Sequence, residues 1–433
     1  MKQDIFRKIL EDHKKLSSLP QVLIEVIRVA NNSDTSIADL SNVVKKDPGL
    51  STRLLRVVNS PFYAPANEIT TISQAVASLG TRAVTAFALS SSIYELMNNV
   101  GESIDRKKFW RHSLEVAMIG RKIADAIGYQ PAEEAFTAGL LHDIGVLILE
   151  ASFPDTFQDV WKLVDTGKNL VAIEENYWNT NHARAGQFIL NQWNIPKIIG
   201  DAVGEHHINL NDTIENKPHR LSLIINLANA CSKFRIHHIP PTENEQLENK
   251  KTLVAELELS NVALAEIERN IISEVVSESG YLEIDIGSVE EILRDANDLL
   301  YYQYIHAERL LQERNEMQKQ IAVDPEGQRT IKSLKEAMSV FGRLMRESSE
   351  IILEQARSLD AATENKDVVD NGHVVDRMTA SMFNYVDTVS MLIKEMENIS
   401  TGKSLCGNGL MDDLIGRFEK QIQNQQPAEK PVG

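Results

Sequence analysis

From residue 16 to about residue 230, apolar residues recur at intervals of three and four, in segment after segment separated by short breaks. This spacing gathers the apolar side chains on one face of a helix. We find no clear alternation of apolar and polar residues flanked by turn signals, which a half-buried strand would require. Glycine and proline are scarce, 21 and 13 among 433 residues, which disfavours a many-turned β-sandwich. The sequence therefore predicts an all-α fold.

The periodic segments set the expected helices. These lie at residues 21–30, 36–44, 50–58, 72–97, 110–127, 132–153, 157–166, 181–193, 196–205 and 221–234, with polar loops at 208–219 and 237–250. Ser36 is the expected cap of the second helix, and Asp47-Pro48-Gly49 is a helix-stopping turn with a capping carboxylate. A further helical block at 255–276 should pack on this domain, and a long polar helix at 288–319 should leave it.

Beyond residue 330 the apolar pattern takes the form of two heptad seams, at residues 331–359 and 375–399, separated by a polar, acidic break. Each seam spans about four heptads, so each helix would be roughly 40 Å long. Two arrangements remain open: an antiparallel pair within one chain, or a homodimer formed through residues 331–400. We thus expect an HD-like domain over 1–290, a connecting helix over 291–330, a heptad-bearing helical pair over 331–400 and a flexible tail over 401–433.

Charge and cysteine content limit the function classes. The formal net charge of −17 disfavours sequence-independent binding of nucleic acid, since nothing offsets the phosphate charge. The two cysteines, Cys231 and Cys406, are too few for a disulfide framework and favour a reducing compartment. The most apolar stretch, residues 138–153, contains three ionisable groups and is shorter than the roughly 20 residues that a bilayer requires. We therefore expect a cytoplasmic protein without a membrane span.

A His-Asp pair interrupts this apolar stretch, at His142 and Asp143. A buried imidazole and carboxylate must be hydrogen-bonded or coordinated to a metal. Imidazole and carboxylate ligands suit Fe, Mn, Ni or Zn, and water activated by such a metal is what phosphoester hydrolysis requires. The alternative is a metal-free structural pair. Gly145 would allow either a tight turn or the close approach of another helix.

Longer motifs extend this observation. The sequence Leu140-Leu-His-Asp-Ile-Gly145, with His112 thirty residues upstream, resembles the His…His-Asp…Asp pattern of the HD phosphohydrolase superfamily. Residues 16–22, 37–63, 72–80 and 182–196 resemble the HDOD domain, in the same order, over about residues 15–230. The resemblance implies an HD-like multi-helical bundle that serves as an output module in bacterial signalling proteins. The HDOD family is usually regarded as having lost phosphohydrolase activity.

The resemblance also implies a metal site, with His112, His142 and Asp143 as ligands. The last ligand of the superfamily is an Asp, but Asn229 stands at that position here. Its carbonyl could still coordinate weakly, although the lost negative charge should lower metal affinity. Val146 stands where active relatives commonly have Lys. These departures predict a catalytically degenerate site.

Three further histidines, His182, His206 and His207, lie where HD-GYP phosphodiesterases of cyclic di-GMP have ligands of a second metal. The Glu and the Gly-Tyr-Pro signature of those enzymes are missing after the His-His pair. Two interpretations remain open for these histidines: ligands of a second metal, or helix-end residues that hydrogen-bond to the backbone.

We therefore expect a bacterial signalling protein that acts by binding a protein partner and has no catalytic residues. The alternative is a metal-dependent phosphohydrolase or phosphodiesterase of nucleotides or cyclic dinucleotides, in which His112, His142 and Asp143 would carry the reaction. A third possibility is a scaffold in which the heptad-bearing helices matter most. The sequence leaves open whether a divalent transition metal (Fe, Mn, Ni or Zn) is bound or the site is metal-free.

Overall fold

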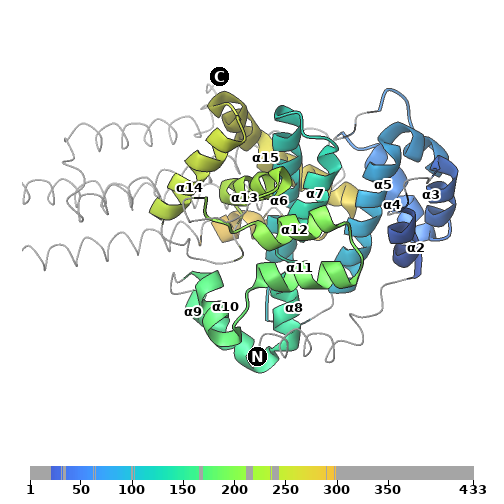
Figure 1. The fold of residues 1–433 in the computed structure, drawn as a ribbon. Coiled ribbons are helices and arrows are strands. Elements are labelled where there is room, and N and C mark those ends of the chain that lie inside the picture. Colours follow the sequence, from blue (N-terminus) through green and yellow to red (C-terminus); the bar gives the residue numbers. More distant parts are fainter. Residues whose placement is uncertain are drawn as a thin grey trace, which may run out of the picture. The chain divides into compact units, whose positions relative to one another are not determined.

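The computed structural model describes residues 21–298, apart from 31, 33–35, 62, 64, 99–100, 102, 165–168, 211–217, 235, 237–242, 289 and 297. The chain divides into two compact units, Met1–Ile286 and Gly287–Gly433, and the helices described below belong to the first. Every regular element among the described residues is a helix, which confirms the predicted all-α class (Figure 1). The heptad seams of residues 331–400 lie outside the described residues.

Four helices form the N-terminal part: α2 (Gln21–Ala30), α3 (Ile37–Val44), α4 (Pro48–Val58) and α5 (Ile72–Met97). Ser36 caps α3 through a reciprocal capping box with Asp39, as the sequence predicted for its start. The Asp47 carboxylate accepts a hydrogen bond from the Leu50 amide and so caps α4. All three shorter helices contact α5, which therefore connects this part to the rest of the domain.

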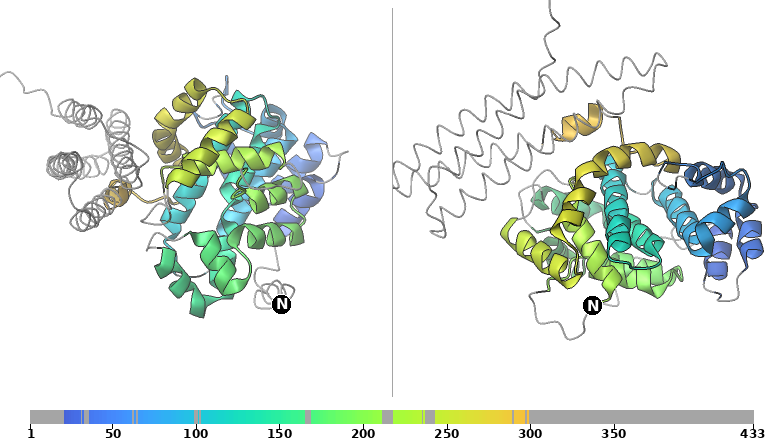
Figure 2. Two further views of the ribbon diagram at one scale, coloured as in Figure 1. Left: turned by 60° about the vertical axis from the view of Figure 1, so that its left-hand side comes forward. Right: turned by 90° about the horizontal axis from the view of Figure 1, so that it is seen from above.

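The central part consists of α6 (Arg106–Ala126), α7 (Ala132–Leu141), α8 (Ile144–Ser152), α11 (His182–Gln192), α12 (Lys197–Glu205) and α13 (Arg220–Cys231). Helix α6 lies at its centre and contacts α7, α13 and α15 (Asn261–Leu282), an arrangement that two views in Figure 2 make clear. Phe109 and Trp110 of α6 are fully buried, and burial of each side chain contributes about 1.5–3 kcal/mol. Helix α11 packs on α8 and α12.

Three element predictions were wrong. The single helix expected at 132–153 is two helices, α7 and α8, which are separated at His142 and Asp143. The polar loop expected at 237–250 includes the start of α14 (Glu243–Glu256), which is anchored near its C-terminus by the buried side chains of Leu253 and Leu257. Helix α10 (Leu170–Trp178), which pairs with α9 (Pro154–Val164), was not predicted.

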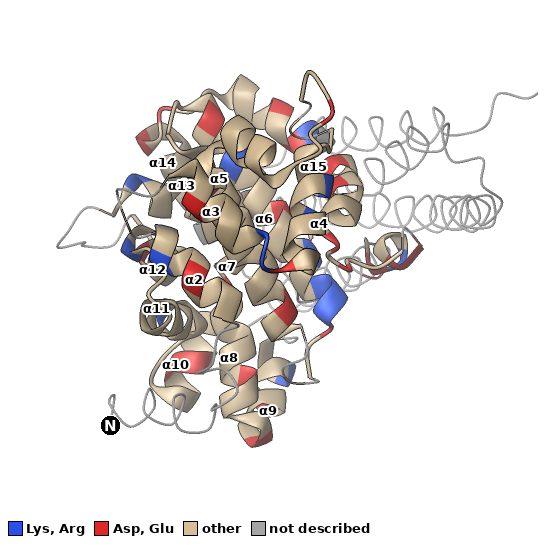
Figure 3. Cartoon of the chain, turned by 90° about the vertical axis from the view of Figure 1, so that its right-hand side faces the viewer, with Lys and Arg blue, Asp and Glu red and all other residues tan. Residues whose placement is uncertain are grey.

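One segment of the described chain, Ala132–Ser152, has the length and composition of a membrane-crossing helix. The most apolar 18-residue stretch of this segment is 94% buried inside the fold, as expected of a core segment in a folded domain. Acidic and basic positions are interspersed along the described helices in the view of Figure 3.

Candidate metal centre

The break between α7 and α8 positions the central carboxylate of the site. His142 directly follows α7, and Asp143 precedes the first residue of α8 without using its side chain as a cap. The Asp143 carboxylate is therefore left for other partners, although the residue is only 8% exposed. A buried carboxylate requires such partners to offset its loss of hydration.

Two glycines bring neighbouring helices close to this break. A Cβ at Gly145 would lie 1.8 Å from the backbone oxygen of His182, so only glycine allows α8 and α11 to approach this closely. A Cβ at Gly139 would lie 2.6 Å from the Cα of Ala117 on α6, the helix that carries His112. Of the two roles predicted for Gly145, the structure therefore shows the close approach of another helix.

The first group of ligand atoms faces one oxygen of the carboxylate. The Oδ2 of Asp143 lies 3.5 Å from the Nε2 of His112 and 3.3 Å from the Nε2 of His142. The two Nε2 atoms are 3.2 Å apart. These three side chains come from α6 and from the junction of α7 and α8.

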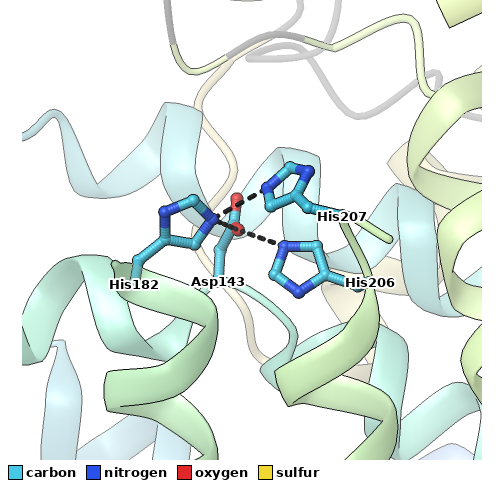
Figure 4. Close-up of side chains that lie close together, drawn as sticks. All are labelled: Asp143, His182, His206 and His207. Atoms are coloured by element: carbon cyan, nitrogen blue, oxygen red, sulfur yellow. Dashed lines mark hydrogen bonds and ion pairs between the residues drawn. The ribbon is translucent and has the colours of Figure 1, made fainter. Parts of the chain in front are cut away.

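The second group faces the other oxygen. The Oδ1 of Asp143 lies 3.4 Å from the Nε2 of His182 and 3.3 Å from the Nε2 of His206 (Figure 4). The Nε2 of His207 lies 2.9 Å from that of His182. His182 is the first residue of α11, and the other two histidines directly follow α12. Asp143 therefore connects both groups, one through each carboxylate oxygen.

Hydrogen bonds at the opposite ring nitrogen orient the imidazoles. The Nδ1 of His142 lies 2.7 Å from the carbonyl of Gly139, and the Nδ1 of His206 lies 2.6 Å from that of Val203. Because a carbonyl can only accept, each Nδ1 carries the proton and each neutral ring keeps its lone pair on Nε2. This tautomer binds a metal through Nε2.

His112 is held from the far side by the segment that follows α13. Its Nδ1 lies 2.9 Å from the Oγ of Ser232 and 3.0 Å from the carbonyl of Phe234. The Ser232 hydroxyl donates to Glu115, which also accepts from the Phe234 amide at 2.8 Å. Burial raises the pKa of Glu115, against the opposing effect of these hydrogen bonds.

His182 is supported by a buried carboxylate. The Oε2 of Glu174 lies 2.6 Å from the Nδ1 of His182 and accepts its backbone amide at 2.9 Å. Burial opposes the charged form of His182, but the attraction and hydrogen bond of Glu174 outweigh it and raise the pKa to about 9. A carboxylate in this position fixes the ring and makes its Nε2 a stronger ligand.

The two central groups are in the protonation states that bind a cation. Burial would raise the pKa of Asp143, but the neighbouring histidines, His142 foremost, hold it well below its usual value. Burial lowers the pKa of His206 to about 4, although Asp143 acts in the opposite direction. Near neutral pH the carboxylate is ionised and the His206 ring is neutral, as metal binding requires.

The donor set fits a first-row divalent ion. The Nε2 of His206 is buried and hydrogen-bonds to no described residue, although it points at Asp143. A tetrahedral ion with bonds of about 2.05 Å separates its ligands by about 3.3 Å. The Oδ1-to-Nε2 distances of 3.4 and 3.3 Å in the second group match this separation. Imidazole-rich sites of this kind suit Zn, Fe or Ni better than Mg or Ca.

The structure brings together all the histidines that the sequence analysis selected, together with the carboxylate: His112, His142, Asp143, His182, His206 and His207. Asn229 lies half-buried on α13, and its side-chain amide hydrogen-bonds to no described residue. Glu174 was missed because α10 was missed. Treating residues 170–178 as a helix would have placed Glu174 on the same face as Trp178, four residues on, and so indicated a buried carboxylate.

The domain is similar to known proteins over a defined range. Residues 16–209 match the sequence profile of the HDOD domain. A crystal structure of an HDOD domain protein with unknown function from Geobacter sulfurreducens has 24% identity and a TM-score of 0.50, and the match covers 63% of this chain and 97% of that one. At this identity the likeness supports the fold alone.

Two curated relatives match shorter parts of their own chains. An uncharacterized protein of Treponema pallidum (strain Nichols) is 23% identical over 195 residues, or 44% of this chain and 37% of the relative. Ribonuclease Y of Chlorobaculum tepidum is 26% identical over 140 residues, or 31% of this chain and 21% of the relative. The similarity therefore spans about a third of the first relative and about a fifth of the second. With the helical bundle and the His/Asp centre in place, the match over residues 16–209 identifies an HDOD domain in this part of the chain.

Proposed function

We propose that this chain is a signalling protein whose HDOD domain acts by binding a protein partner. Its His/Asp centre holds a divalent transition metal and does not turn over a substrate. The observation that carries this proposal is the burial of the ligands inside the helical bundle.

Four of the five imidazoles are closed off from solvent. His112 is 5% exposed, His182 is 1% exposed, and His142 and His206 are fully buried. Only His207 is exposed. Little of the ligand set is therefore open to a phosphodiester, so the centre is poorly placed to exchange substrate and product.

The surroundings of the centre also lack the cations that phosphate chemistry uses. Among the described residues, the partners of Asp143 are histidines, and no lysine or arginine pairs with it. Val146, in the first turn of α8, is 1% exposed and apolar, where related active enzymes commonly have lysine. Without a cation, the charge that develops on a phosphoryl group would be stabilised by the metal alone.

A metal bound here would supply a cross-link between helices as well as a Lewis acid. Bound between Asp143 before α8, His182 of α11 and His206 after α12, it would join three elements of the bundle. Binding free energy at such a centre adds to folding free energy because the ligands come together only in the folded chain. The metal would therefore fix the surface that the bundle presents to a partner.

Hydrolysis tests this proposal. The metal-loaded chain should show no turnover of bis(p-nitrophenyl) phosphate, cyclic dinucleotides or single-stranded RNA above that of the metal salt alone. The His142→Ala variant should give the same result. A turnover that the His142→Ala variant abolishes would contradict the proposal.

A second candidate, a metal-dependent phosphodiesterase, is favoured by one observation. The two oxygens of Asp143 face two separate groups of histidines, as in a centre that holds two ions. The partial similarity to a ribonuclease points in the same direction. For this candidate the purified chain should contain close to two equivalents of metal, and less than a tenth of an equivalent would exclude it.

A further inference from the structure

The His/Asp centre divides into two unequal halves. The three-ligand half consists of His112, His142 and the Oδ2 of Asp143. The four-ligand half consists of the Oδ1 of Asp143 with His182, His206 and His207. Because both halves share one carboxylate, an ion in either half draws on the same negative charge.

The support behind the ligands also differs between the halves. In the three-ligand half, the far nitrogens of His112 and His142 hydrogen-bond to neutral groups, a hydroxyl and backbone carbonyls. In the four-ligand half, the far nitrogen of His182 is bonded to the ionisable carboxyl group of Glu174, which is itself fully buried. A carboxylate partner strengthens an imidazole ligand more than a neutral acceptor does, and its loss typically lowers metal affinity 10–100-fold.

A third difference is a ligand atom that has no hydrogen-bond partner. The Nε2 of His206 is buried and has no hydrogen-bond partner in the described chain, but it lies 3.3 Å from the Oδ1 of Asp143. In the three-ligand half the two Nε2 atoms contact each other at 3.2 Å. An ion in the four-ligand half would give His206 the partner that burial demands.

We infer that the four-ligand half binds one divalent transition metal ahead of the three-ligand half, and that Glu174 is a positioning residue for this ion. The inference rests on the proposed metal binding of the centre. It assigns the tighter site to Asp143, His182, His206 and His207, with a nitrogen-rich donor set of three imidazoles and one carboxylate.

The test is a titration of the metal-free, full-length chain with Co²⁺, whose visible absorption reports the number and geometry of its ligands. The first Co²⁺ equivalent bound by the wild-type chain should give the absorption of a tetrahedral site. Its affinity should be at least tenfold higher than that of any second equivalent. Glu174→Gln should lower the affinity for the first Co²⁺ equivalent 10–100-fold. The His207→Ala variant changes an exposed side chain and should lower the affinity for the first Co²⁺ equivalent at least tenfold.

Two controls accompany these variants. Glu175→Gln changes the neighbouring acidic residue, which is exposed and pairs with Asn181 and Arg184, and should leave the first equivalent unchanged. His112→Ala removes a ligand of the three-ligand half and should change the affinity for the first Co²⁺ equivalent by less than threefold. Circular dichroism of each metal-free variant checks that the helices are retained.

The outcomes separate the two levels of the proposal. If His112→Ala removes the first equivalent while Glu174→Gln and His207→Ala retain it, the three-ligand half binds first and the inference is wrong. Two equivalents of equal affinity would also contradict it. If the wild-type chain binds neither Co²⁺ nor Zn²⁺ stoichiometrically, the inference fails together with the metal part of the proposed function.

Discussion

Single residues decide how closely the helices around the metal centre approach. At Gly145 an added Cβ would overlap the backbone of α11, whereas at Gly280 of α15 it would meet nothing within 4 Å. Gly145→Ala should therefore lower the free energy of unfolding by more than about 2 kcal/mol, since two backbones must separate. Gly280→Ala should change it by less than about 1 kcal/mol, in the stabilising direction that alanine has in a helix. Urea unfolding followed by circular dichroism distinguishes them, and equal effects would contradict the close approach.

The thiol of Cys231 should be unreactive in the folded chain. The residue is 4% exposed, and burial raises the pKa of its thiol to about 12. At pH 8 roughly one thiol in 10⁴ would be ionised, and the thiolate is the reactive form. In a Cys406→Ala background, a thiol reagent such as DTNB should label the native chain at least 100-fold more slowly than the urea-unfolded chain. Labelling of the native chain at the rate of a free thiol would show that the side chain is accessible.

The sequence predicted those site residues whose signal is local. His142 and Asp143 stand out because they are adjacent and interrupt an apolar stretch. Glu174 has no such signal, since its partner His182 follows eight residues later on another helix. Glu115 has still less of a local signal, because it accepts a hydrogen bond from the hydroxyl of Ser232, which lies 117 residues away in the sequence. Contacts of this kind are set by tertiary packing and leave no periodic trace in the sequence.

At the scale of elements, the same distinction explains which helices were predicted. Helices α2, α5 and α11 have strong caps or regular apolar faces, and their predicted ranges agree closely with the structure. The break between α7 and α8 falls where apolar residues flank both sides and neither position 142 nor 143 is Gly or Pro, so periodicity predicts one helix. Helix α14 was missed because most of its residues are polar or charged, and the buried Leu253 and Leu257 lie at or just beyond its C-terminal end.

Glu115 links two elements, and its titration should be visible in stability. This residue of α6 accepts hydrogen bonds from the segment after α13, and burial raises its pKa above the ordinary value of 4.5. As pH rises through the window between 4.5 and the folded-state pKa, the unfolded chain has released a proton that the folded chain still holds. The free energy of unfolding contributed by Glu115 therefore falls with rising pH.

The comparison with Glu115→Gln isolates this contribution, because glutamine is neutral throughout. The stability difference, wild type minus variant, should be largest near pH 4.5 and should shrink as pH increases. Urea unfolding of both chains from pH 4.5 to 8 measures it. A difference that grows with pH would mean that the ionised carboxylate is the favoured form in the folded chain.

At the scale of the whole molecule, the chain divides into the units Met1–Ile286 and Gly287–Gly433, and the matched HDOD range lies within the first. The heptad seams of residues 331–400 lie outside the described residues, so the predicted homodimer stays a prediction. If those seams form the dimer, a chain ending at residue 320 should be monomeric, and a chain ending at residue 400 should remain dimeric. Light scattering coupled to size-exclusion chromatography gives both masses. A dimer that persists after truncation at residue 320 would remove the role assigned to the heptads.

The central claim is that a buried His/Asp centre binds metal without serving as a hydrolytic active site. The most direct measurement counts metal equivalents per chain by elemental analysis and assays phosphodiester hydrolysis on the same preparation. We expect close to one equivalent of a transition metal and no hydrolysis above the metal-salt background. Two equivalents per chain, with hydrolysis that disappears when His142 is replaced, would contradict it.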